Sequence, residues 1–146
     1  MSRASKIYAY FISTVGLSLG LYCVYSYFTL IVTCANPKYE LEQFGILLLL
    51  YILCRCFPIY IRDDYAIDMS FICNLAAILC KGPVVAATMI LFSTLFVIEP
   101  SHTEDRKFIH IFNTSPIKTA FNTSNFILTV YFAGVIYEKS GGIIGT

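Results

Sequence analysis

The hydrophobic residues of this chain come in long blocks and not at a strand or amphipathic-helix period. Five blocks stand out, and for each we predict a helix that crosses a lipid bilayer. The five predicted spans are Ile7–Cys34, Phe44–Ile61, Ala66–Lys81, Val84–Ile98 and Ile117–Tyr137. The predicted fold class is therefore all-α, a polytopic transmembrane helical bundle that forms a single integral membrane domain over residues 1–146.

The stretch Tyr65–Glu99 predicts a tight helical hairpin on which the rest of the bundle is organised. Its two apolar runs meet at Lys81-Gly82-Pro83. Pro83 has no N–H and disfavours helical geometry in the residue before it, so the helix must break there. Each run is close to the lower limit of roughly 17 residues for a bilayer span. The pattern leaves open whether 66–98 crosses twice or forms a re-entrant hairpin.

The polar stretches between the blocks predict the connections. We expect Tyr39–Gln43 to be a short acidic connector and Pro58 to kink the last turn of the second span. Glu99–Pro116 is a long polar loop in which Phe108–Phe112 predicts a short interfacial helix. A glycine pair after Lys139 predicts the end of the last helix.

Composition supports the same interpretation. Of 146 residues, 58% are hydrophobic and only 13% are charged, whereas soluble domains average about 25% charged residues. Mean hydropathy is +0.73. The net charge of +1 gives no electrostatic basis for nucleic-acid binding. The first apolar block is far longer than the core of a signal peptide, so we expect it to be a retained span.

The distribution of Lys and Arg predicts the orientation, because cytoplasmic loops are enriched in these residues. With the N-terminus inside, six basic residues are cytoplasmic and three are external, leaving aside Arg55 within a span. The cytoplasmic six are Arg3, Lys6, Arg62, Arg106, Lys107 and Lys118, and the external three are Lys38, Lys81 and Lys139. We therefore expect a multi-pass plasma-membrane protein with a cytoplasmic N-terminus.

A few polar side chains inside the predicted spans are candidates for a site. They form a stripe on the last span, and others lie near the hairpin. The candidates for lining a ligand pocket are Asp68, Asn74, Asn122, Asn125 and Thr129. In hydrocarbon such groups must face the bundle interior or a wet cavity, so they are either hydrogen bonds between helices or the lining of a pocket.

Two further features each have two interpretations. Arg55 either extends its side chain to the interface or forms a buried ion pair with Asp68. Ser13, Gly16 and Gly20 form a small-residue face. Such faces let helices approach closely in lipid, either within one chain or between two chains of a homodimer.

The sequence predicts no metal site, cofactor or catalytic activity. The six cysteines lie in or at the end of apolar blocks, where cysteine usually behaves as a small hydrophobic residue. Both histidines lie in the polar loop, away from the cysteines. We find no pattern typical of a nucleophile with its base, a metal-ligand set or a phosphate-binding loop.

From the hairpin onward the chain resembles the multi-span N-terminal sensory region of bacterial signalling proteins that carry HD-GYP or GGDEF domains. The resemblance covers about residues 60–142. It rests on Met69-Ser70-Phe71, Ala76-Ala77, Gly82-Pro83-Val84-Val85-Ala86-Ala87, Phe121-Asn122, and Val135-Ile136-Tyr137 followed by Gly141-Gly142. It implies a further span and a cytoplasmic effector, which would make this chain a truncated input module. Lys81 departs from the apolar or aromatic residue usual in that family.

The resemblance implies a signal-input module that controls a cyclic-dinucleotide effector. Two alternatives remain. Size and the Gly-Pro turn are weakly similar to vitamin-binding subunits of energy-coupling transporters, which implies small-molecule binding beside a transporter subunit. A structural membrane protein without a ligand is the third interpretation. In each case the lipid bilayer is the expected partner.

Overall fold

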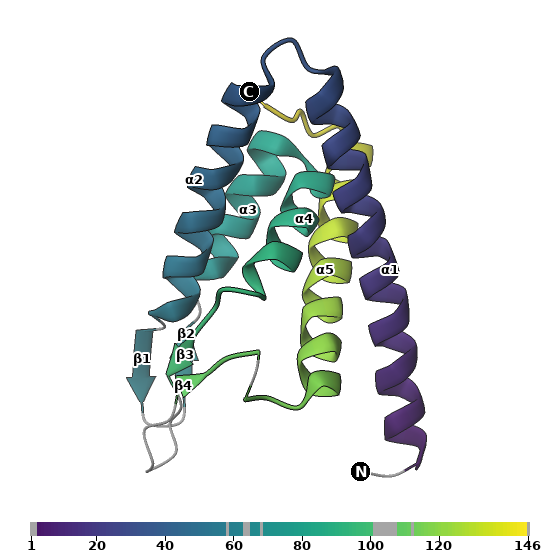
Figure 1. Ribbon diagram of the computed structural model, residues 1–146, viewed down its shortest axis with the longest axis vertical. Helices are drawn as coiled ribbons and strands as arrows, with labels where there is room; N and C mark the ends of the chain where they lie inside the picture. The colour runs from purple at the N-terminus through teal and green to yellow at the C-terminus, as the bar shows by residue number, and fades with distance from the viewer. Residues whose placement is uncertain are drawn as a thin grey trace.

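The structure, a computed structural model, describes residues 3–57, 59–62, 65–67, 69–100, 108–111 and 113–145. It is a bundle of five helices with short strand pairs at one end (Figure 1). The helices are α1 (Arg3–Thr33), α2 (Pro37–Cys56), α3 (Ser70–Lys81), α4 (Pro83–Ser93) and α5 (Pro116–Lys139). The strands β1 (Ile59–Arg62) and β2 (Tyr65–Ile67) pair antiparallel, as do β3 (Glu99–Pro100) and β4 (Phe108–Ile109).

The helices alternate in direction between two ends of the bundle (Figure 1). The chain's N-terminus, the strands and the start of α5 lie at one end, which we call the N-end. The α1–α2 connection, the turn between α3 and α4, and the C-terminus lie at the other, which we call the C-end. The all-α bundle predicted from the sequence is therefore confirmed.

The first and last predicted helices match the structure closely, and the second does not. The expected connector 39–43 belongs to α2, which begins at Pro37. Asn36 caps this helix by accepting a hydrogen bond from the Tyr39 N–H at 3.4 Å. A capping Asn followed by Pro marks a helix start. The N–H groups in the first turn of a helix have no partner within the helix, so Pro can occupy this turn without the loss of a hydrogen bond. The predicted connector was therefore wrong.

The apolar runs around the hairpin are only partly helical, which corrects three expected boundaries. The second helix ends at Cys56, and 59–61 belong to β1. The third begins at Ser70, since 65–67 belong to β2, and the fourth ends at Ser93, before a turn at 94–96. The prediction of a short interfacial helix at 108–112 was also wrong, because 108–109 form β4. The expected kink at Pro58 lies outside the described residues.

Among the described residues, two helices are long and apolar enough to cross a membrane: the part of α1 over Ser5–Thr33, and α5. This is fewer than the five predicted. Within its 20 residues, α2 carries Lys38, Glu40, Glu42 and Arg55. Helices α3 and α4 have 12 and 11 residues, or about 18 and 16 Å, against a hydrocarbon thickness of about 30 Å.

The closest helix packing joins α1 to α5. A Cβ atom added to Gly16 would lie 2.6 Å from the Ser124 Cα, so only glycine allows this approach. The Ser124 hydroxyl donates a hydrogen bond of 3.0 Å to the Ser13 carbonyl. Ile127 of α5 packs against Gly20. The small-residue face is thus covered by α5 of the same chain.

The hairpin turns at Gly82, whose φ of 87° favours glycine. Its tip is fixed to the start of α2, because the Lys81 Nζ lies 2.8 Å from the Glu40 Oε2. Near the other end of α2, the Sγ atoms of Cys54 and Cys73 are 3.5 Å apart. Helix α3 therefore runs antiparallel along most of α2 and reaches the C-end.

We expect Gly16→Ala to lower the free energy of unfolding by about 1–3 kcal/mol, the usual cost of overpacking a close contact. Gly45 of α2 is the matched control, because an added Cβ meets nothing within 4 Å. Gly45→Ala should be neutral or stabilising by about 0.5–1 kcal/mol. Unfolding of both variants in mixed micelles measures the difference, and equal effects would contradict the α1–α5 packing.

We also expect mild oxidation to join Cys54 and Cys73, because their sulfur atoms need only a small approach to reach bonding distance. Mass spectrometry of peptides after copper–phenanthroline treatment identifies the pair. Cys73→Ser should abolish the cross-linked peptide. Pairing of Cys54 with another cysteine would show that α2 and α3 pack differently.

Candidate functional site

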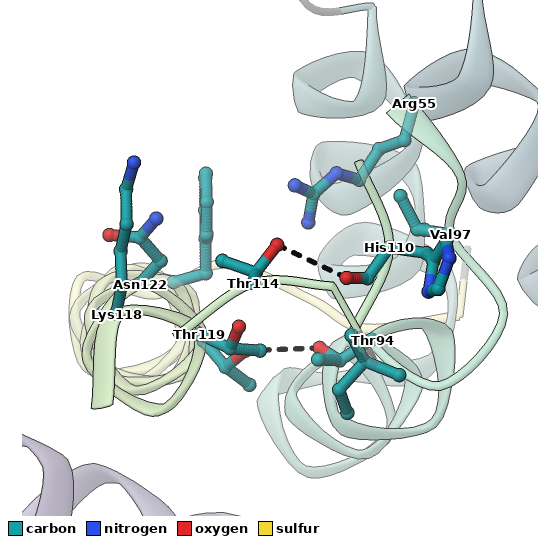
Figure 2. A pocket seen from close by; sticks show the side chains of 11 residues that line it. Arg55, Thr94, Val97, His110, Thr114, Lys118, Thr119 and Asn122 are labelled. Carbon is teal, nitrogen blue, oxygen red and sulfur yellow. Dashed lines mark hydrogen bonds between the residues drawn. The ribbon is translucent and has the colours of Figure 1, made fainter. Parts of the chain in front are cut away.

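A polar cavity of about 210 Å³ opens at the N-end of the bundle, where α2 and α4 end and α5 begins (Figure 2). We call it the basic pocket. Its described lining residues are Arg55, Thr94, Val97, His110, Ile111, Thr114, Lys118, Thr119, Asn122, Thr123 and Phe126. They come from α2, from α5, from the segment that follows α4 and from the segment before α5, so relative movement of these elements changes the pocket.

Arg55 and Lys118 approach the basic pocket from opposite walls. Arg55 extends from the last turn of α2, and its guanidinium carbon lies 5.2 Å from the centre of the Phe126 ring. Lys118 lies in the first turn of α5, and Asn122 lies one turn further along (Figure 2). Stacking on an aromatic ring orients an arginine side chain.

Hydroxyl groups and a tight turn form the remaining walls. The Thr94 and Thr123 hydroxyls are 3.2 Å apart and join the end of α4 to α5. The Asn113 side-chain carbonyl accepts a hydrogen bond of 2.8 Å from the His110 N–H. The Thr114 hydroxyl donates to the His110 carbonyl at 3.1 Å. The two bonds to His110 close a tight turn directly before α5, and the Thr94–Thr123 contact joins α5 to the end of α4.

The acidic and basic residues differ in number along the described lining of the basic pocket. Its described lining includes Arg55 and Lys118 and no Asp or Glu. The first turn of α5 adds the positive end of a helix dipole, since Lys118 and Thr119 both belong to it. The ion pair of Glu40 with Lys81 lies at the opposite end. This arrangement of basic groups, hydroxyls and a helix N-terminus suits an anionic group such as phosphate or carboxylate.

A second cavity, of about 320 Å³, lies between α3 and α5 and is almost entirely apolar. We call it the apolar groove. Its described lining residues are Ser70, Phe71, Asn74, Leu75, Ile78, Phe126, Thr129, Val130 and Ala133. Asn74 is only 7% exposed, and its Oδ1 has no hydrogen-bond partner among the described residues. An unpaired buried carbonyl costs about 1–3 kcal/mol.

The structure separates the predicted pocket residues into different places. Asn122 lines the basic pocket, while Asn74 and Thr129 line the apolar groove. Asn125 is half-buried, and it is not one of the described residues that line either cavity. Asp68 lies outside the described residues, and with it the predicted ion pair with Arg55. The polar stripe predicted on α5 is therefore divided between two adjoining cavities.

Sequence reasoning missed several residues of the basic pocket. It placed Lys118 on the polar stripe of the last span but not among the named pocket candidates, and it treated the 110–114 segment as part of a loop. The hydroxyls of Thr94 and Thr123 meet only because α4 ends beside α5, which no local pattern reveals. The described residues contain no group of three or more His, Cys, Asp or Glu that could hold a metal ion.

Comparison of the chain with protein families, with curated proteins and with solved structures finds no match.

We expect Asn74→Leu to raise the free energy of unfolding without ligand, because it removes a buried carbonyl that has no partner. Thr88→Val is the matched control. Thr88 is fully buried, but its hydroxyl already donates to the Val84 carbonyl at 2.8 Å. This variant should be neutral or slightly destabilising. Unfolding in mixed micelles compares the two, and a loss of stability in Asn74→Leu would show that the amide contributes to the folded bundle.

Proposed function

We propose that this chain is a multi-pass membrane protein that acts as a signal-input module and binds its ligand at the N-end of the bundle. The proposed location in the bilayer is supported by the side chains on the outer surface of the bundle. Large apolar side chains are exposed along the helices, for example Leu21 at 64%, Val32 at 83% and Ile136 at 64%. Soluble monomers rarely expose apolar patches beyond a few hundred Å². In lipid the same surface meets acyl chains.

The alternating direction of the helices supports five passes (Figure 1), of which α1 and α5 have the length of a full span among the described helices. Helices α1 and α5 have 31 and 24 residues, or about 46 and 36 Å, enough for the hydrocarbon layer. The hairpin of α3 and α4 reaches the C-end, where Lys81 pairs with Glu40 of α2. Extended segments flank this hairpin at the N-end, β2 before α3 and β3 after α4. We infer that each short helix together with its extended segment makes one pass. We place the N-end in the cytoplasm, following the excess of Lys and Arg there.

The basic pocket is the observation that carries the signalling proposal. Its walls belong to α2, α5, the segment that follows α4 and the segment before α5. A ligand that bridges these walls binds one relative arrangement of the helices better than another, and it thereby shifts the population of arrangements. In the signalling proteins that this chain resembles, such a shift would reach a cytoplasmic effector domain.

Reporter fusions test the proposed membrane arrangement. Alkaline phosphatase joined after the last residue should be active and green fluorescent protein should be dark, because the C-end is external. The matched fusion after Phe57, at the end of α2, should give the reverse pattern. Extraction of the chain by alkaline carbonate, or fluorescence of the C-terminal fusion, would contradict the proposal.

The reading frame downstream of this chain tests the signalling part separately. A frame that encodes an HD-GYP or GGDEF domain, with a further span before it, supports control of a cyclic-dinucleotide effector. A neighbouring transporter ATPase would instead favour a small-molecule uptake subunit that uses the same pocket, and it would contradict the signalling assignment.

A further inference from the structure

The apolar groove is a cavity that the proposed function does not use. It lies between α3 and α5, which pack against each other less extensively than α1 and α5 do. Its volume of about 320 Å³ is at the lower end of the range of roughly 300–1,000 Å³ that is typical of small-molecule pockets. The size of the groove therefore suits a compact molecule rather than a lipid with two acyl chains.

A buried amide in the wall of the groove is available to a ligand. Asn74 lines the groove and is only 7% exposed, and its Oδ1 has no hydrogen-bond partner among the described residues. A carbonyl oxygen only accepts hydrogen bonds, so the group that would satisfy it is a donor. The oxygen itself is covered in the structure. Because χ2 of asparagine has a broad preference, rotation of the amide turns the oxygen toward the groove at low cost.

The other walls determine the body of the ligand. Phe71 of α3 and Phe126 of α5 both line the groove, and an aromatic ring packs well against other rings in an edge or offset arrangement. None of the described lining residues carries a charge, and burial of an unpaired charge is costly, so the ligand must be neutral. Phe71 and Leu75 are 69% and 45% exposed. The groove is therefore open to the side, and a ligand enters it without passing through the bundle.

We propose that the apolar groove binds a small neutral phenol, with its ring between Phe71 and Phe126 and its hydroxyl donating a hydrogen bond to the Asn74 Oδ1. Phe71 and Asn74 are three residues apart in α3 and so lie on one face of the helix. A phenol is neutral at pH 7, since its pKa is about 10. A hydrocarbon of the same shape would fill the groove but leave the carbonyl unpaired. The inference goes beyond the proposed function, because neither the basic pocket nor its ligand takes part.

Photolabelling of the full chain in micelles with a diazirine-bearing phenol tests this inference, and mass spectrometry of peptides locates the label. The label should lie on α3 and α5 at the groove. 4-Propylphenol and its methyl ether, 4-propylanisole, are matched competitors, because they share a ring and a chain but the ether has no donor. At equal mole fraction in the micelle, the phenol should displace the label about fivefold better, the ratio that corresponds to one neutral hydrogen bond.

Asn74→Leu isolates the hydrogen bond, because it removes the acceptor with little change in the size of the side chain. In this variant the phenol and the ether should compete about equally, and the ether should compete as it does with the wild-type chain. The difference between the two competitors then measures the coupling of the hydroxyl to the amide. Asn125→Leu is the matched control, since Asn125 is not among the described residues of either cavity. This variant should keep the fivefold preference.

Ala133→Phe tests the location, because the larger side chain would fill space in the groove. It should lower the labelling of α3 and α5 and weaken binding of both competitors. Thr33→Phe, on the exposed C-terminal turn of α1, should change neither. The Cys54–Cys73 cross-link reports whether each variant keeps its fold.

Two results would overturn the inference. Equal displacement by the phenol and the ether with the wild-type chain, or an unchanged preference in Asn74→Leu, would show that the amide does not recognise the hydroxyl. Labelling that spreads over the exposed apolar side chains and is unchanged in Ala133→Phe would show that the phenol only partitions onto the outer surface. Either result leaves the reporter-fusion pattern as it is, so failure of the groove site is distinguishable from failure of the proposed function.

Discussion

The contact between Gly16 and Ser124 is the constraint on which the rest of the bundle depends. It brings the backbones of α1 and α5 together, and the Ser124 hydroxyl closes the contact with a hydrogen bond to the Ser13 carbonyl. In the proposed bilayer location apolar helices gain little hydrophobic energy from one another, so close packing and hydrogen bonds between them would hold the bundle. This contact supplies both and fixes the rotation of α5.

The rotation of α5 about its own axis determines which neighbouring helix each of its polar residues faces. With Ser124 and Ile127 turned toward α1, and Gly134 close to Pro83 of α4, these sides of α5 are filled. The face toward α3 packs less extensively than the face toward α1, and it is there that the apolar groove forms. The N-terminal turn of the same face meets Arg55 across the basic pocket. One helix–helix contact thus positions both cavities.

How much the sequence predicts differs from element to element, for physical reasons. The first and last helices follow from long apolar runs, and the Gly82 turn follows from the chemistry of glycine and proline. The ends of α2, α3 and α4 do not follow, because the apolar flanks at 59–61, 65–67 and 95–98 suit a strand or turn as well as a helix. Asn74, Asn122 and Thr129 were expected to line a pocket. Their division between two cavities depends on how α3, α4 and α5 meet, which is tertiary information.

A nitroxide scan along α5 in liposomes tests the central claim, that this helix is held against α1 in lipid and presents one face to a site. Labels at Phe132 and Ile136, both exposed, should be accessible to oxygen and shielded from a water-soluble nickel chelate. A label at Ser124 should be shielded from both, and one at Asn122 should reach the chelate. Access of the chelate to Phe132 and Ile136 would indicate a water-soluble bundle and contradict the account.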